Sequence, residues 1–144
     1  MSQQRKTPTL IDVRGPRFSA TLTVIVLAVA LATQNAWVLA FQAVVFAIGA
    51  IRGPQFTPYA FIFKRIVKPR LRGEVVTEDS RPPQFAQTVG FLFALAGLLG
   101  AAIGSVAVFN VAVGFALAAA FLNSVFNYCL GCEMYLLVLR IRTR

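Results

Sequence analysis

The chain has two cysteines, and their spacing makes them its best candidates for chemistry. Cys129 and Cys132 are three positions apart, so on a helix the two sulfurs lie on one face and can meet. Such a pair can form a disulfide, bind a soft metal or pass sulfur between thiolates. Gly131 lies between them and, lacking a side chain, permits close approach by a partner. The pattern predicts thiol–disulfide redox exchange or sulfur transfer, although two cysteines in a helix can also serve only as small apolar residues.

Several aromatic and charged residues and one glycine are expected to support the cysteine pair. They are Tyr128, Gly131, Glu133, Tyr135, Arg14, Arg17 and Arg81. The tyrosines and the glutamate flank the pair and would shape access to its sulfurs. A cation beside a thiol favours the thiolate, and the arginines would do this or hold an anion. We therefore expect the arginines and the cysteines to lie at the same end of the molecule.

The chain has no histidine, which narrows the chemistry. Haem or zinc ligation by histidine is excluded, as is any Ser–His or Cys–His catalytic pair within one chain. Zinc or an iron–sulfur cluster normally requires four ligands, whereas one chain offers two thiols. Cys129 and Cys132 would therefore hold a metal only if it were shared across a dimer, or with Glu133 and a residue of a partner. The sequence identifies no cofactor.

The composition is that of an integral membrane protein. The 144 residues are 58% hydrophobic and 13% charged, with a mean hydropathy of +0.72. A soluble domain is closer to half apolar and a quarter charged. So few charges cannot cover a water-soluble surface, and the apolar residues occur in long runs. A chain of this length makes one domain, spanning residues 1–144.

Four apolar runs predict four transmembrane helices in an all-α, polytopic membrane protein. The spans are about 18–34, 35–52, 85–103 and 106–126. The first two are near the lower limit of roughly 17 residues for a spanning helix. Short joints within each half predict two helical hairpins, connected by a loop over 53–84. Residues 127–144 are predicted to leave the bilayer as an interfacial extension.

The distribution of charge predicts the topology. The net charge is +9, and every Lys and Arg lies in the terminal segments or in the stretch from Arg52 to Arg81. The turns near Gln34–Asn35 and Gly104–Ser105 carry none. Because cytoplasmic segments are enriched in Lys and Arg, both termini and the long loop are predicted to be cytoplasmic in the inner or plasma membrane of a cell. These cations would contact lipid headgroups of the bilayer, and nucleic-acid binding is not predicted.

The polar residues inside and between the spans have structural interpretations. A basic, aromatic-rich stretch between Pro58 and Pro69 predicts a short helix lying along the headgroups. Gln42 and Asn110 are expected to form hydrogen bonds between helices. Between their end residues the spans contain no Asp, Glu, Lys or Arg, which argues against an ion-coupled carrier or a proton channel.

Small residues predict close helix contacts. Gly100 and Gly104 form a GxxxG pattern, which lets helix backbones approach closely in lipid. Two uses stay open: internal packing of the second hairpin, or a homodimer through the Gly100/Gly104 face.

Three stretches resemble a known family in order, spacing and chain length. They are Asp12-Val13-Arg14-Gly15-Pro16-Arg17-Phe18, Glu78-Asp79-Ser80-Arg81-Pro82-Pro83-Gln84-Phe85-Ala86-Gln87 and Tyr128-Cys129-Leu130-Gly131-Cys132-Glu133-Met134-Tyr135. The chain is similar to small bacterial, actinobacterial-type membrane proteins known as domain of unknown function 4395. The resemblance implies a four-span architecture and a shared cysteine pair, and it suggests a thioredoxin-like or sulfurtransferase partner. It supplies no function.

The first two stretches also suggest a contact between the hairpins. Arg14, Arg17 and Arg81 lie at the same predicted depth as three carboxylates, Asp12, Glu78 and Asp79. Arginine–carboxylate pairs there would join the hairpins at the inner face, although separate solvated headgroup contacts are an equal alternative.

Two functions from different classes follow. The first is a membrane-embedded CxxC protein in thiol–disulfide redox or sulfur transfer at the cytoplasmic face. The second is a non-catalytic accessory or assembly subunit of a larger membrane complex, using its glycine face and basic loop as contact surfaces. A small-solute carrier ranks third, because obvious broken helices are absent from the sequence.

Overall fold

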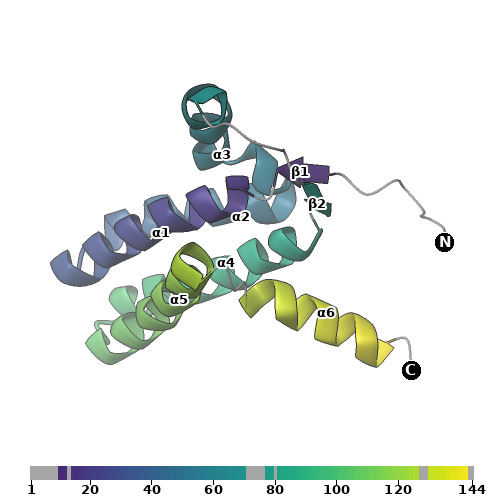
Figure 1. Cartoon of the computed structure of the whole chain (residues 1–144). Coiled ribbons are helices and arrows are strands. Elements are labelled where there is room, and N and C mark those ends of the chain that lie inside the picture. Colours follow the sequence, from purple (N-terminus) through teal and green to yellow (C-terminus); the bar gives the residue numbers. More distant parts are fainter. Residues whose placement is uncertain (1–9, 13, 71–76, 80, 127–129, 143–144) are drawn as a thin grey trace.

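Four long helices form a bundle, and shorter elements gather at one end of it (Figure 1). The computed structural model describes residues 10–12, 14–70, 77–79, 81–126 and 130–142. The long helices are α1 (Arg14–Thr33), α2 (Ala36–Ile51), α4 (Arg81–Ala102) and α5 (Val106–Phe126). A further helix, α6 (Leu130–Arg142), extends away from the bundle. The prediction of a helical fold is thus confirmed for the described residues, apart from one short ribbon of strands.

Three of the four long helices are long and apolar enough to cross a membrane, namely α1, α4 and α5. The fourth apolar helix, α2, has 16 residues, which at 1.5 Å per residue is about 24 Å. A bilayer hydrocarbon core is about 30 Å thick, so α2 is short for a span by itself. The four-span topology therefore stays a prediction.

Local chemistry determines where the hairpin turns lie. The side chain of Asn35 accepts a hydrogen bond from the backbone N–H of Trp37 at 2.9 Å and so begins α2. The turn between α4 and α5 contains Gly104 with φ of +77°, a conformation that glycine adopts without steric cost. Ser105 Oγ then accepts from the backbone N–H of Val108 at 3.2 Å. Both turns lie at the end of the bundle opposite α3 and α6.

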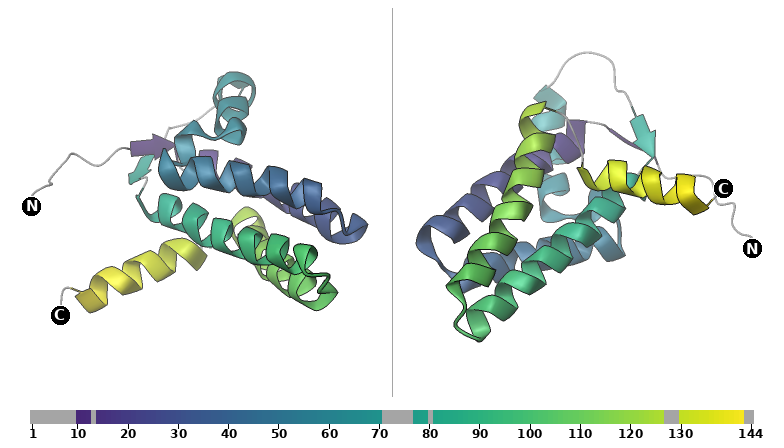
Figure 2. Two further views of the ribbon diagram at one scale, coloured as in Figure 1. Left: turned by 180° about the vertical axis from the view of Figure 1, so that it is seen from behind. Right: turned by 90° about the horizontal axis from the view of Figure 1, so that it is seen from below.

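The two hairpins pack side by side, with α1 against α5 and α2 against α4 (Figure 2). Their shared core is built around Leu27, Leu39, Phe46, Phe109 and Val113. Hydrogen bonds accompany this packing, and the one formed by Asn110 lies near the exposed hairpin turns. Gln34 next to the end of α1 donates from Nε2 to Asn110 Oδ1 of α5 at 2.8 Å.

Glycines on α4 receive side chains from both neighbouring helices. A Cβ placed on Gly90 would lie 2.7 Å from Phe46 of α2, and one on Gly97 would lie 2.8 Å from Leu39. A Cβ on Gly100 would meet the backbone nitrogen of Phe109 at 2.8 Å. Internal packing therefore accounts for Gly100, and Gly104 lies in the turn. Nothing in this geometry supports a homodimer through the Gly100/Gly104 face.

A two-stranded antiparallel ribbon joins the segments that precede α1 and α4. It pairs β1 (Leu10–Asp12) with β2 (Thr77–Asp79), with Ile11 opposite Glu78. The all-α prediction missed this ribbon. Its backbone ladder holds the entry points of α1 and α4 together, which was the role expected of arginine–carboxylate pairs.

The connector after α2 is helical, and Pro58 begins its α-helix as predicted, whereas the helical turns continue past Pro69. It contains the 3-10 turn η1 (Pro54–Phe56), α3 (Pro58–Ile62), the π-helical turn η2 (Phe63–Val67) and the 3-10 turn η3 (Lys68–Arg70). The Thr57 hydroxyl accepts from the backbone N–H of Ala60 at 3.2 Å and begins α3. Lys64 and Arg65 are exposed.

The substitution Gly100→Ala tests the close approach of α4 and α5. The added methyl group meets backbone, which cannot rotate away, so we expect a loss of about 1–3 kcal/mol of stability. Gly114→Ala is the matched control, because nothing lies within 4 Å of the place that its new methyl group would take. Thermal unfolding in detergent should show a lower melting temperature for Gly100→Ala alone. Equal melting temperatures for the two variants would contradict the packing.

Candidate functional site

The described half of the cysteine pair lies in the first turn of α6. Cys132 is half-buried and disulfide-bonded, whereas Tyr128 and Cys129 lie outside the described residues. Backbone N–H groups in a helix's first turn favour negative charge, so a thiolate formed there is stabilised. Glu133 is exposed in the same turn, while Arg140 and Arg142 lie in the last. This order of charge complements the dipole of α6.

Aromatic packing sets the position of α6 on α4. The ring of Tyr135 lies 5.7 Å from that of Phe85, centroid to centroid, at an interplanar angle of 54°. Tyr135 is half-buried by this contact. This contact anchors α6 on α4, and the role of Tyr135 in shaping access to the sulfurs stays a prediction. Phe85, in the first turns of α4, was not predicted as a supporting residue.

Arg17 binds the end of α5, immediately before the cysteine segment. Its Nε donates to the carbonyl oxygen of Ser124 at 3.0 Å, and its Nη2 donates to that of Val125 at 3.4 Å. The last carbonyls of a helix lack partners within the helix and carry partial negative charge, which explains their affinity for a guanidinium. Among the described residues the partners of Arg17 are these carbonyls. The side chains of Asp12, Glu78 and Asp79 lie outside the described residues, so the arginine–carboxylate pairs stay a prediction.

A second contact supports the same junction. The hydroxyls of Thr21 and Ser124 lie 3.0 Å apart and are hydrogen-bonded. Because the cysteine segment begins just after α5, these contacts hold its starting point against α1. Arg14 and Arg81 begin α1 and α4, and each has an interaction of its own. The structure thus brings Arg17, Cys132 and Tyr135 to one end of the bundle.

A buried polar chain holds the connector to the first hairpin. The Tyr59 hydroxyl donates to Gln42 Oε1 at 2.6 Å, and Gln42 Nε2 donates to Thr23 Oγ1 at 3.5 Å. Gln42 is fully buried. Burial raises the pKa of Tyr59 to about 12, because the charged phenolate is poorly solvated there. The phenol stays protonated at neutral pH and serves as a structural donor. The interhelical role predicted for Gln42 is confirmed.

The described residues contain no group of three or more His, Cys, Asp or Glu side chains placed to hold a metal ion. A site shared across a dimer by the cysteines therefore stays a prediction.

Fold and composition define a class of protein: a helical bundle with three helices long and apolar enough to span a membrane. Within that class, a family model described as Domain of unknown function (DUF4395) matches residues 11–140. The chain belongs to this family, as its motifs indicated. No curated protein and no solved structure matches it.

Replacing Arg17 by Gln removes the charged donors from the end of α5. We expect the junction between α1 and α5 to weaken by on the order of 1 kcal/mol, with a lower melting temperature in detergent. Arg142→Gln, which removes an equal charge from the exposed end of α6, should leave the melting temperature unchanged. If the two variants melt alike, the contacts of Arg17 with Ser124 and Val125 do not hold the junction.

Proposed function

We propose that the chain is a membrane-embedded dithiol protein that exchanges electrons or sulfur through Cys129 and Cys132 at the cytoplasmic face. One observation carries the proposal: Cys132 lies half-buried in the first turn of α6 and is disulfide-bonded. A helix N-terminus favours the thiolate, which is the reactive form in exchange. The position therefore suits both the oxidised and the reduced state of such a pair.

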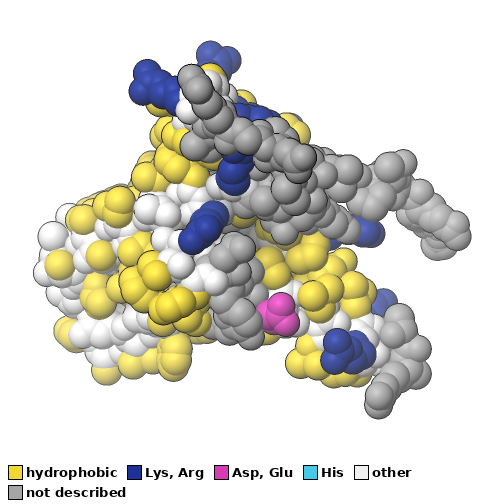
Figure 3. Space-filling view, viewed as in Figure 1, with side chains coloured by type: hydrophobic (Ala, Val, Ile, Leu, Met, Phe, Trp, Pro, Cys, Tyr) yellow, Lys and Arg dark blue, Asp and Glu magenta, His cyan; other side chains and the backbone are white. Residues whose placement is uncertain are grey.

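The proposed topology has four spans in two hairpins, with both termini cytoplasmic in the plasma membrane. The described Lys and Arg residues lie at the end of the bundle that carries α3 and α6, whereas the hairpin turns carry no charge (Figure 3). The positive-inside rule assigns the charged end to the cytoplasm. Trp37 is 83% exposed beside the opposite turn, at a depth suited to an interfacial indole. In this topology Trp37 lies at one membrane interface and Arg52 lies at the other, so the two residues mark the ends of the short α2 in the bilayer.

The redox step conserves atoms and electrons. One cysteine thiolate attacks a sulfur of a partner's disulfide and forms a mixed disulfide, releasing the partner's other thiolate. The second cysteine then attacks the mixed disulfide, closes the Cys129–Cys132 disulfide and releases the partner's second thiol. The partner gains two electrons and two protons, which this chain's dithiol loses. A thioredoxin-like protein has the required chemistry.

Sulfur transfer uses the same two residues. A sulfurtransferase partner would deliver a sulfane sulfur to one cysteine as a persulfide. The second cysteine thiol would then attack the persulfide's inner sulfur, closing the disulfide and releasing hydrogen sulfide. This pathway needs a reductant, such as a dithiol partner, to restore the two thiols. Both pathways depend on a disulfide that opens and closes readily.

The alternative function is a non-catalytic accessory subunit, and the surface of α6 favours it. Leu137, Val138 and Ile141 are each more than 40% exposed, so much of this helix is apolar and uncovered by its own chain. In that case the disulfide would serve only to stabilise the start of α6. The two functions differ in the reduction potential of the disulfide.

A glutathione redox titration of the purified protein in detergent distinguishes them. Exchanging dithiols have potentials near −120 to −270 mV, whereas structural disulfides are typically below about −300 mV. We expect a single two-electron transition in the exchanging range, measured by the mass added by a maleimide. A disulfide that resists reduced glutathione, with a potential below about −300 mV, would refute exchange and favour the accessory role.

The single variants Cys129→Ser and Cys132→Ser provide the control. Each variant keeps one thiol, which reacts with oxidised glutathione to form a mixed disulfide with one glutathione. No neighbouring thiol can then displace that glutathione, so the adduct should be stable. The double variant should acquire no glutathione. Failure of both single variants to form an adduct would mean that the thiols are inaccessible to a partner.

A further inference from the structure

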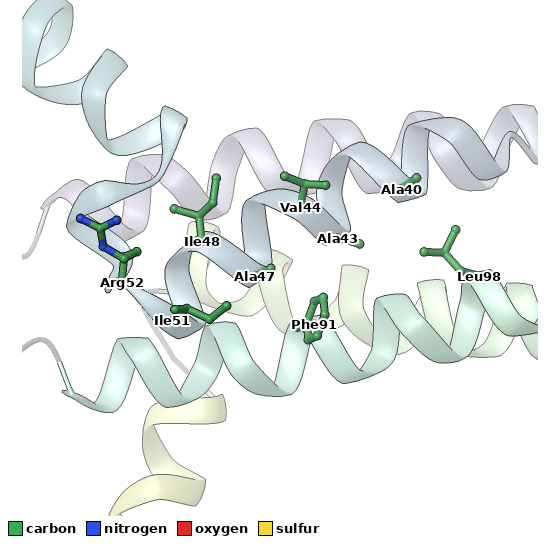
Figure 4. A pocket seen from close by; sticks show the side chains of 9 residues that line it. All are labelled: Ala40, Ala43, Val44, Ala47, Ile48, Ile51, Arg52, Phe91 and Leu98. Carbon is green, nitrogen blue, oxygen red and sulfur yellow. The ribbon is translucent and has the colours of Figure 1, made fainter.

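An apolar groove runs along the outer surface between α2 and α4 (Figure 4). Its volume is about 440 Å³. Small side chains of α2 form its floor, side chains of α4 form its far wall, and one arginine closes one end. These residues include Ala40, Ala43, Ala47, Phe91, Leu98 and Arg52. Apart from Arg52, every lining side chain is hydrocarbon.

The groove results from an uneven packing of the two helices. Along one line of the seam, Phe46 and Leu39 fill the space above Gly90 and Gly97. Beside that line α2 presents alanines, which are too small to fill the space up to α4. The result is a shallow trough that is open to the outside, lies among lipid-facing residues and is lined by the protein's own helices.

The length and direction of the trough match one acyl chain. From Ala40 to Arg52 the helix rises about 18 Å, at 1.5 Å per residue. One leaflet of the hydrocarbon core is half of roughly 30 Å thick, or about 15 Å. The trough follows α2, which the proposed topology orients across the bilayer. An acyl chain lying in it would therefore place its headgroup beside Arg52.

The side chain of Arg52 is exposed, so its guanidinium N–H groups can donate hydrogen bonds to a ligand. Its guanidinium carbon lies 5.5 Å from the centre of the Phe56 ring, which fixes the side chain by a cation–π contact. In the part of the chain that the structure describes, its guanidinium makes no hydrogen bond or ion pair. Lys64, bound to the carbonyl oxygen of Gln55 at 3.0 Å, adds a second cation to the segment that follows. A planar guanidinium suits bidentate binding of phosphate.

We propose that this groove is a binding site for an anionic phospholipid, with one acyl chain along Ala40, Ala43 and Ala47 and the phosphate on Arg52. Charge complementarity selects an anionic lipid, because Arg52 and Lys64 are both cations and both are exposed. This lipid site rests on the proposed topology of α2 in the membrane, but it does not depend on the proposed chemistry of the cysteines.

Native mass spectrometry of the full chain, released from nanodiscs, tests the site. The probes are phosphatidylglycerol and phosphatidylcholine with identical acyl chains. We expect the wild-type protein to retain phosphatidylglycerol preferentially. Arg52→Gln should lower its retention about fivefold, since a cation near the headgroups contributes about 1 kcal/mol. Arg142→Gln, which removes a charge from the exposed end of α6, should leave retention unchanged.

Filling the groove tests the position of the acyl chain. Ala47→Phe should reduce retention of both lipids, because the ring occupies the trough, and Ala40→Leu provides a milder variant if the first fails to fold. Equal retention of the two lipids by the wild type, or an effect of Arg52→Gln no larger than that of Arg142→Gln, would overturn the proposal. A loss in both arginine variants would indicate general charge attraction instead of a site.

Discussion

The close approach of α4 to α2 and α5 is the packing constraint on which the position of the cysteine segment depends. In lipid there is no hydrophobic force between helices, so packing and interhelical hydrogen bonds must hold them together. Gly90 and Gly97 let α2 sink its side chains against the α4 backbone, and Gly100 does the same for the start of α5. With α4 central, α6 can rest on its first turns through Phe85 and Tyr135. The location of the cysteine segment therefore depends on packing deeper in the bundle.

Three contacts hold the elements together at the charged end of the molecule. The β1–β2 ribbon holds the entries of α1 and α4 together, and Arg17 ties the entry of α1 to the exit of α5. Tyr59 fixes the connector through Gln42. Three links thus converge on the end where α6 begins, and none of them uses an ion pair with a described carboxylate. The segment that carries the cysteines therefore begins at a well-packed junction. Much of the surface of α6 beyond it is exposed.

Much of the fold could be predicted from the sequence because apolar runs, short polar joints and prolines are local signals. Asn35 and Gly104 mark the turns, and Pro58 marks the start of the connector helix. The β-ribbon was missed because each of its strands has only three residues. Such a strand is too short to show the alternation of apolar and polar residues that indicates β-structure. Their pairing depends on contacts between segments that are distant in the chain.

The candidate site was predictable in its residues but not in its geometry. The cysteine spacing identified Cys132, and its neighbours Glu133 and Tyr135 followed from their places beside the pair. Residue types offer no sign that Arg17 would bind carbonyls at the end of α5, because every residue has a backbone carbonyl. The anchoring of Tyr135 by Phe85 depends on the angle at which α6 leaves α5, which only the assembled bundle determines.

Thiol labelling in intact cells tests whether the cysteine pair and the hairpin turns lie on opposite sides of the membrane. A membrane-impermeant maleimide would be applied to the natural chain, and to a Cys129→Ser, Cys132→Ser chain that also carries Ala102→Cys at the exposed end of α4. We expect labelling of the Ala102→Cys chain in intact cells, whereas the natural cysteines should be labelled only after lysis and reduction. Labelling of the natural cysteines in intact cells, with Ala102→Cys protected until lysis, would contradict the topology and the cytoplasmic thiol function with it.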